Sequence, residues 1–347
     1  MNILIIFINN INSIKNLGFD LRYETLRKIA FYLKDKHKIY VMPCDAGTKL
    51  TSDVVKNFEI FNFSKKNSIN LCIGWIPVIH KQNLRKKINC EFICYENGPI
   101  KNSVIIDPNG VGYGDYEPFY TNTLNNLCVK DYDDNKCTQF LKSYIKNNNS
   151  KRPQSNIIDI PTNINNKYIF MPTQKHTDIF FTNAKIGVFD SITKTALYCK
   201  NKNIYLVIKI HPAIGDNLRR EQINHINQIK RSYQNIFISQ SSINYLMKNA
   251  LFTVSLNGFT IIDNFINQTP LLTLLPNMYY KTDALVYNED IFKGLDIMFH
   301  NKYDKEKMFI KQKQIIWWYM KNNLFYDYSV EKNIEILNKH LQHKILI

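Results

Sequence analysis

Residues able to bind a charged group follow two apolar runs in the second half of the chain. The run Tyr205–Ile210 leads directly into His211-Pro212, and the run Leu251–Leu256 leads into the tetrapeptide NGFT at Asn257–Thr260. Continuous apolar runs of this length are typical of strands buried on both faces of a parallel sheet. The carboxyl ends of such strands form the edge where open α/β sheets bind ligands.

A phosphate group would suit both strand ends. A turn from a strand into a helix directs free backbone N–H groups and the positive end of the helix dipole at the space above the sheet. Taken singly, His-Pro often only ends a strand, and glycine often serves backbone geometry. Together, His211 and the turn containing Asn257, Gly258 and Thr260 predict one shared anion site, to which Lys209 adds charge if the strand alternation is disturbed.

Two carboxylates in the first half could take part in proton transfer or nucleophilic attack. Glu96 follows the run EFICY and precedes Gly98-Pro99, whereas Asp107 follows SVII and precedes Pro108-Asn109-Gly110. Both lie where a strand becomes a turn, so both are expected to point from the same edge of the sheet. Asp-Pro-Asn-Gly is also an ordinary turn in which the Asp caps its own backbone. For Glu96, the neighbouring residues give less reason to assume a purely structural role.

The elements that must position these carboxylates alternate between apolar runs and a helical pattern. Asn9–Gly18 is expected to be a polar loop, and Asp20 to cap a helix that runs to about Lys36. Strands are expected at Ile3–Ile8, Ile39–Met42, Ile69–Ile73, Phe92–Tyr95 and Val104–Ile106. The pattern predicts one open sheet with helices on its faces.

The periodicity is lost between Lys146 and Asn166, where the chain is rich in Asn and contains two prolines. We therefore expect a first domain at residues 1–150 and a linker at 151–166. Strands are then expected at 168–171, 204–210, 236–238, 251–256 and 271–274, and helices at about 184–200, 217–232, 242–249 and 259–267. This alternation predicts a second doubly wound domain at 167–300.

The charge balance favours an anionic partner. Lys and Arg outnumber Asp and Glu by 45 to 29, a net charge of +16. A nucleotide sugar, an acidic glycan, anionic lipid or nucleic acid would all fit. The chain shows neither the basic and aromatic motifs of an RNA-binding module nor zinc-finger spacing, so we expect no nucleic-acid partner.

The seven cysteines are scattered and odd in number, which favours reduced thiols in a cytoplasmic protein. Cys90 and Cys94 are four residues apart, but no histidine cluster joins them, so no metal site is expected. The opening MNILIIFI is too short for a signal sequence, and no stretch is long enough to span a membrane. The sequence indicates no cofactor.

Four segments resemble the capsule polysaccharide synthesis proteins related to bacterial β-Kdo transferases, and more loosely sialyltransferases with an HP motif. They are CYENGPIKNSVIIDPNGVGYGD at Cys94–Asp115, YIFMPTQKHTD at Tyr168–Asp178, VIKIHP ending at Pro212, and Asn257–Pro270. Their order and spacing match the family along the chain. Three positions depart from the family pattern: Gly258 replaces Ser, Asp263 replaces Glu, and Asn97 stands where a second carboxylate is common.

The resemblance implies two Rossmann-like domains facing across a cleft, the GT-B architecture, and a metal-independent glycosyltransferase. It adds Gln174 and Asp263 to a nucleotide-binding set of Lys209, His211, Pro212, Asn257, Gly258 and Thr260. Backbone amides and His211 would stabilise the departing phosphate. Glu96 would act as the base on the acceptor hydroxyl, or Asp107 would attack the sugar if configuration is retained. The sequence does not choose between them.

The resemblance further implies a CMP-activated acidic sugar such as Kdo as donor, and a glycan or lipid-linked glycan acceptor in capsule synthesis. A neutral sugar carried by UDP or GDP stays open. A teichoic-acid-type polyol-phosphate transferase is the enzymatic alternative. A non-catalytic carbohydrate-binding relative is the other, given the changes at Asn97, Gly258 and Asp263.

Residues 301–347 are expected to be helical. The segment Met308–Met320 mixes bulky apolar residues with Lys311 and Lys313. It could lie on an anionic membrane surface, which would place the protein peripherally at the inner membrane. The interpretation that the resemblance favours is a packed helix running back across the seam between the two domains.

Overall fold

The computed structural model describes residues 1–8, 21–44, 50–65, 67–75, 83–110, 117–150, 154–176, 185–212, 214–258 and 260–341. The expected loop at Asn9–Gly18, the Asp20 cap, Phe259, and the ends of two family-like segments at 111–115 and 177–178 lie outside the described residues.

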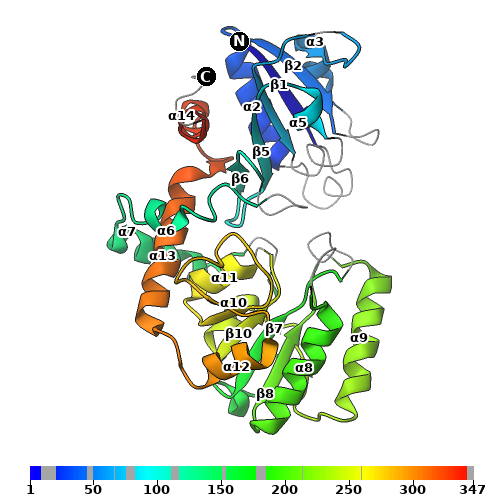
Figure 1. Ribbon diagram of the computed structural model, residues 1–347, viewed down its shortest axis with the longest axis vertical. Helices are drawn as coiled ribbons and strands as arrows, with labels where there is room; N and C mark the ends of the chain where they lie inside the picture. The colour runs from blue at the N-terminus through cyan, green and yellow to red at the C-terminus, as the bar shows by residue number, and fades with distance from the viewer. Residues whose placement is uncertain are drawn as a thin grey trace. The chain divides into compact units, whose positions relative to one another are not determined.

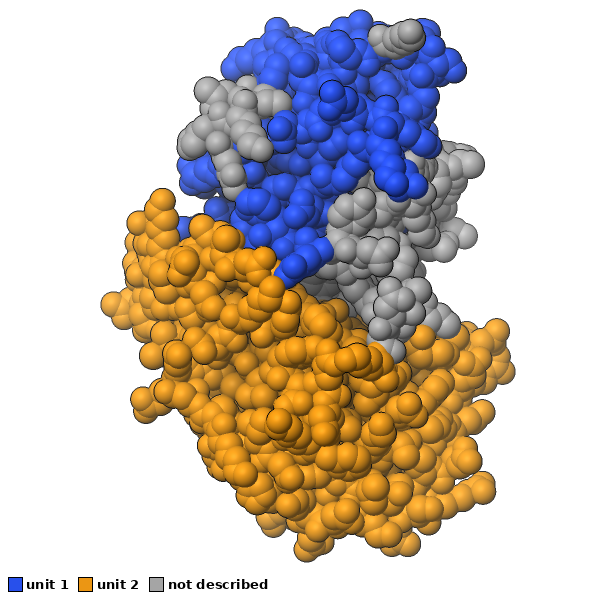
Figure 2. Space-filling model, in the orientation of Figure 1, with its two compact units in different colours: residues 1–120, 319–347 blue, residues 121–318 orange. Residues whose placement is uncertain are grey.

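The chain forms two compact units (Figure 2). The first contains residues 1–120 and 319–347, and the second contains residues 121–318. This grouping differs from the expected limits in two places. Residues 121–150 belong with the second unit because α7 (Asp134–Lys146) packs on α11 (Thr260–Asn267), and residues 319–347 complete the first unit.

The first unit contains an open sheet (Figure 1), and its strand order is β13-β6-β5-β4-β1-β2-β3. Strands β1 to β5 are parallel, whereas β6 and β13 each run antiparallel to a neighbour. Its elements are β1 (Asn2–Phe7), α2 (Leu21–Leu33), β2 (Lys38–Pro43), α3 (Ser52–Asn57), β3 (Glu59–Ile60), β4 (Leu71–Trp75), α5 (Leu84–Lys87), β5 (Glu91–Asn97), β6 (Ser103–Asp107), β13 (Leu324–Phe325) and α14 (Val330–His340).

The direction of β6 follows from the short connection before it. Residues 98–102 join β5 to β6, and a parallel crossover needs a dozen residues or more. Gly98 closes this hairpin by donating its N–H to the carbonyl of Ser103 at 2.7 Å. A Cβ at Gly98 would lie 2.7 Å from the backbone carbon of Ser103, so a residue without a side chain is needed here.

The end of the chain completes the core of the first unit. Ile336 and Leu337 of α14 are fully buried in the same apolar cluster as Ile3–Phe7 of β1. Strand β13 was not expected, because two residues are too few to show an alternation in sequence.

The second unit contains a parallel sheet (Figure 1), and its strand order is β12-β11-β10-β7-β8-β9. This is the Rossmann order, in which the chain leaves the first strand in both directions. Its elements are α6 (Leu124–Leu127), α7, the 3-10 helix Thr162–Ile164, β7 (Tyr168–Pro172), α8 (Val188–Asn201), β8 (Tyr205–Lys209), α9 (Asp216–Lys230), β9 (Ile236–Ile238), α10 (Ile243–Lys248), β10 (Phe252–Ser255), α11, β11 (Leu271–Thr273), β12 (Val286–Tyr287), α12 (Ile291–Phe299) and α13 (Lys305–Asn322) as far as Trp318.

Alternating side chains of β7 supply two different cores. Ile169 and Met171 pack in the cluster that contains residues of α8, α9 and α12, whereas Tyr168 and Phe170 pack with Leu246 of α10. Both faces of the strand are covered, which explains its continuous apolar run.

Helix α13 packs one face against the rest of the chain. Ile315 and Ile316 are fully buried, Lys311 Nζ donates to the carbonyl of Asn125 at 3.2 Å, and Lys313 Nζ pairs with Asp134 at 3.0 Å. These contacts support the interpretation of a packed helix, and its position at a domain seam stays a prediction. Among the helices that the structure describes, none has the length and apolar character required to cross a membrane.

Candidate functional site

The switch point of the second unit lies between β7 and β10, where the strand order reverses. Gln174, just after β7, bridges this point to the turn after β10. Its Oε1 accepts the N–H of Asn257 at 3.2 Å, and its Nε2 donates to the carbonyl of the same residue. Two of the predicted site residues are therefore in direct contact.

Gly258 owes its identity to the same amide. Its φ is +100°, and a Cβ built there would lie 2.2 Å from Gln174 Nε2. A serine at this position would be strained by its backbone and would collide with Gln174. The departure from the family's Ser therefore has a local reason in this chain.

A second set of hydrogen bonds connects β7 to the end of β8. Thr173 Oγ1 accepts the N–H of His211 at 3.2 Å and donates to Gln222 Oε1 at 2.8 Å. Gln222 Nε2 in turn donates to the carbonyl of Gln174 at 2.7 Å. Thr173 is 2% exposed and Gln222 is fully buried, so this network fixes the backbone from which the half-buried His211 projects.

Sequence reasoning missed Thr173 and Gln222. The position of Gln222 could have indicated a buried polar network. It lies four residues before Ile226, and these two are the buried side chains of α9. A glutamine on the inner face of an amphipathic helix needs a polar partner in the interior.

The start of α11 lies beside this junction. Asn257 Nδ2 donates to the carbonyl of Pro276 at 3.2 Å, which ties the turn to the segment after β11. Thr260 begins the helix, and its Oγ1 is buried without a hydrogen-bond partner among the described residues. Asp263 is in the first helical turn and 6% exposed. Pro212, after His211, is exposed.

Lys209 has a structural role that was not predicted. Its Nζ donates to the carbonyls of Gln240 at 3.1 Å and Ser241 at 2.6 Å, in the loop after β9. Burial lowers the pKa of this ammonium group, and the charge of Asp159 opposes that effect. Lys209 therefore holds a neighbouring loop in place.

Glu96 in the first unit is surrounded by donors. Its Oε1 accepts from Arg22 Nη1 at 2.5 Å and from the N–H of Asn97 at 2.6 Å, and its Oε2 accepts from Trp75 Nε1 at 2.7 Å. The side chain of Glu96 keeps 22% exposure, whereas that of Arg22 has 5%. The carboxylate is thus fixed in direction and still reachable.

Arg22 and Trp75 were not predicted as site residues. The Arg22 guanidinium lies 5.7 Å from the centre of the Trp75 ring, so the two donors also support each other. Arg22 lies in the first turn of the helix after β1, and Trp75 ends β4. Their positions next to strand ends could have marked both side chains as candidate site residues.

Asp107 is fully buried and caps its own loop. Its Oδ1 accepts the N–H groups of Asn109 at 2.7 Å, Gly110 at 2.9 Å and Phe119 at 3.2 Å. Its Oδ2 is buried with no hydrogen-bond partner in the described part of the chain. Burial raises the pKa of this carboxyl to about 7, because it outweighs the backbone N–H groups that lower it.

The expectation that Glu96 and Asp107 point from one strand edge needs correction, because β6 runs antiparallel to β5. Asp107 is paired with Cys94, and Glu96 is paired with Ile105. Side chains two apart on a strand share a face, so Glu96 and Asp107 are diagonal neighbours on one face of the sheet.

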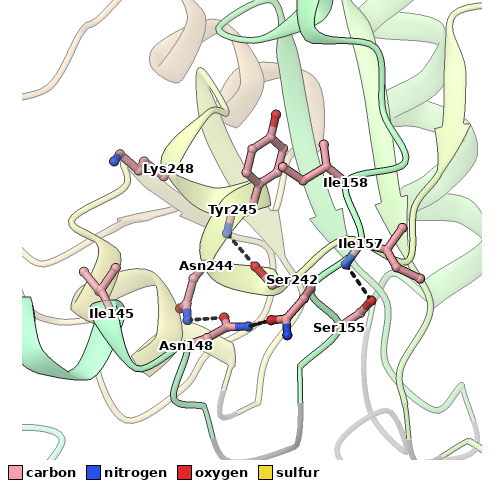
Figure 3. Close-up of a pocket in the computed structure, with 10 residues that line it drawn as sticks. Ile145, Asn148, Ser155, Ile157, Ile158, Ser242, Asn244, Tyr245 and Lys248 are labelled. Atoms are coloured by element: carbon pink, nitrogen blue, oxygen red, sulfur yellow. Dashed lines mark hydrogen bonds between the residues drawn. The ribbon is translucent and has the colours of Figure 1, made fainter.

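One open cavity of about 280 Å³ lies in the second unit (Figure 3). Asn244 Nδ2 donates to Asn148 Oδ1 at 3.2 Å in its wall. It is lined by Ile145, Asn148, Ser155, Asn156, Ile157, Ile158, Ser242, Asn244, Tyr245 and Lys248. None of the predicted site residues is among them.

Within the described residues, the thiols and the other side chains that can bind metals do not form a metal site. All seven cysteines are free, and Cys90 alone among them is only half-buried. No three His, Cys, Asp or Glu side chains gather as a metal would require, within the ranges that the structure describes.

Two units with Rossmann strand orders, the first extended by β6 and β13, give the chain a glycosyltransferase-like fold. Two solved structures of Thermosulfurimonas dismutans KpsC have this fold. The β-Kdo 2,7-transferase aligns with a TM-score of 0.54 and 13% identity over 97% of this chain and 100% of that one. The β-Kdo 2,4-transferase aligns with a TM-score of 0.55 and 10% identity over 90% and 89%.

The predicted resemblance to β-Kdo transferases is thereby confirmed for the fold, as is the prediction of two Rossmann-like domains. No protein-family model and no curated protein matches the sequence.

Proposed function

We propose that the protein is a glycosyltransferase that moves a sugar from a nucleotide donor to a glycan or lipid-linked glycan acceptor. The observation that carries this proposal is the switch-point network, in which Gln174 and Thr173 hold the turn at Asn257 and the backbone of His211. Ligands of open α/β sheets bind at such a crevice.

In this proposal, the second unit binds the donor. His211 and the backbone N–H groups at the start of α11 contact the phosphate, and they stabilise the negative charge that develops as the nucleotide leaves. Asp263 and Thr260, in the first turn of that helix, contribute further polar groups. A CMP-activated acidic sugar such as Kdo is the favoured donor, supported by the fold shared with two β-Kdo transferases.

The acceptor side of the reaction belongs to the first unit. Glu96 is the favoured general base because it is oriented by three donors and keeps some exposure. Asp107 is the alternative, as a nucleophile in a retaining reaction. Because Asp107 is fully buried, the groups around it would have to rearrange before its carboxylate could reach a sugar.

A nucleotide panel and one substitution test the proposal. CMP, UDP, GDP and a CDP-linked polyol are compared for their effect on the melting temperature, and turnover is then measured with the matching sugar in excess chelator. His211→Ala should lower turnover roughly a hundredfold, on the scale of one lost preorganised donor. His300→Ala is the matched control, because His300 directly follows α12 and its side chain is 47% exposed.

Each other outcome contradicts the proposal in a distinct way. Selective stabilisation by a CDP-linked polyol would indicate a polyol-phosphate transferase. No response to any nucleotide would indicate a carbohydrate-binding protein. Full turnover in His211→Ala would remove this residue from the site.

A further inference from the structure

Three large apolar side chains are exposed along one short segment of the first unit. Val55, Ile60 and Phe63 are 46%, 51% and 47% exposed. Val54, Phe58 and Phe61, between and beside them, are buried in the core and anchor the segment. Single exposed apolar residues are common, but three on one short, anchored segment favour a binding surface.

Lysines from three other elements surround this segment. Lys87 Nζ, at the end of α5, lies 5.6 Å from the centre of the Phe63 ring. Lys38 Nζ on β2 pairs with Glu59 at 3.2 Å, and Lys34 Nζ after α2 contacts Asn57 Oδ1 at 3.4 Å. The segment itself and the same neighbouring elements also carry exposed Lys36, Lys56, Lys65 and Lys86.

Positive charge predominates at this place. Of the acidic groups on the same elements, Glu59 is paired with Lys38 and Asp53 is paired with Arg27 at 2.6 Å. Asp35 is the remaining acidic residue between α2 and β2. We call this surface the α3–β3 corner, made of Val55, Ile60 and Phe63 with Lys34, Lys36, Lys38, Lys56, Lys65, Lys86 and Lys87.

We propose that the α3–β3 corner binds the surface of an anionic lipid bilayer. Apolar side chains that enter the headgroup region, flanked by lysines that attract acidic headgroups, are the combination that holds a protein on such a surface. A strand from another protein would bind poorly here, because β3 offers only two residues for strand pairing and lysines border it. The surface is distinct from α13, whose Lys311 and Lys313 are bonded within the second unit.

The experiment is flotation of the full chain with vesicles of phosphatidylcholine alone or mixed with phosphatidylglycerol. The wild type should float with the mixed vesicles only, and added salt should release it. Ile60→Ser combined with Phe63→Ser should weaken binding about tenfold or more, since it removes the inserted apolar groups. Lys36→Gln, Lys56→Gln and Lys65→Gln together should do the same. All five side chains are exposed, so the fold should persist, as the melting temperature would show.

The matched control is Ile157→Ser with Ile158→Ser, two residues of the second unit that are 63% and 56% exposed. It should bind vesicles like the wild type. The proposal is overturned if the wild type does not bind mixed vesicles, if neither corner variant weakens binding, or if the control weakens it equally. It also fails if the corner variants abolish a dimer seen by light scattering and leave vesicle binding intact. Vesicle binding needs no donor, so this test is independent of the proposed transferase activity.

Discussion

At the scale of single residues, Asp107 has the environment that departs furthest from that of an exposed carboxyl among the carboxyl groups that the structure describes. Its pKa is raised from 3.8 to about 7, because burial outweighs the backbone N–H groups that face it. Between these two values the folded chain retains a proton that the unfolded chain has released. Stability therefore falls as the pH rises through this window, and it levels off above about pH 7.

Asp107→Asn should remove this dependence, since an amide cannot release the proton. Its Oδ1 can still accept from Asn109, Gly110 and Phe119. Relative to the wild type, the variant should gain up to roughly 4 kcal/mol between pH 4 and 7, the free energy of a shift of about three pKa units. Urea unfolding at a series of pH values measures it, and an unchanged difference across the window would contradict the raised pKa.

Glu96→Gln should lower turnover by about two to four orders of magnitude, the usual scale for a lost general base. The free energy of unfolding should fall too, because Arg22 is 5% exposed and would lose its charged partner. Donor affinity should change little, since the proposed nucleotide site belongs to the other unit.

The control is Asp53→Asn, which removes the ion pair with Arg27 at 2.6 Å in the same unit. It separates the loss of an ion pair from the loss of a base, and its turnover should stay near the wild-type value. If Glu96→Gln remained fully active while Asp107→Asn were inactive, Asp107 would be the catalytic carboxylate and a covalent double displacement would be the better mechanism.

At the scale of elements, the end of β7 organises the proposed donor site. Thr173→Val keeps the shape of the side chain and removes the hydroxyl shared by His211 and Gln222. A buried amide oxygen and a backbone N–H lose a partner, which should cost about 1–3 kcal/mol of stability. Nucleotide affinity should fall as well, because the His211 backbone is no longer held.

A double-mutant cycle with Gln222→Leu distinguishes this network from ordinary packing. The two substitutions should be less than additive in unfolding free energy, since each breaks the same hydrogen bond. Strict additivity, with unchanged nucleotide binding, would show that Thr173 does not position His211.

At the scale of the whole molecule, the first unit depends on both ends of the chain. β13 pairs with β6, and Ile334, Ile336 and Leu337 of α14 enter the core of the N-terminal sheet. Tyr120 OH also bonds to Nδ1 of the buried His340.

A chain ending at Asn323 should therefore lose the fold of its first unit. Losing the burial of these three aliphatic side chains costs about 5 kcal/mol or more, which is comparable to the total stability of a domain. Protease should cut residues 21–110 rapidly and spare residues 185–318. A chain ending at Leu341 is the control. Equal protease resistance of the two would contradict a structural role for β13 and α14.

The sequence alone determined the buried strands of the two sheets, because burial on both faces of a strand produces an apolar run that is visible locally, as in Tyr205–Ile210. It also located the glycine turn at Gly258 and the strand-end residues Glu96, Asp107 and His211. Backbone geometry and strand ends leave short-range marks in a sequence.

Only the tertiary structure decided which side chains meet. The partners of Glu96 are Arg22 and Trp75, and the amide of Gln174 reaches Asn257 from far along the chain. It also turned Lys209 toward the loop after β9, and it brought β13 back beside β6. Such contacts depend on the order of strands in a sheet and on the length of the connections between them, and neither leaves a periodic pattern in the residues involved.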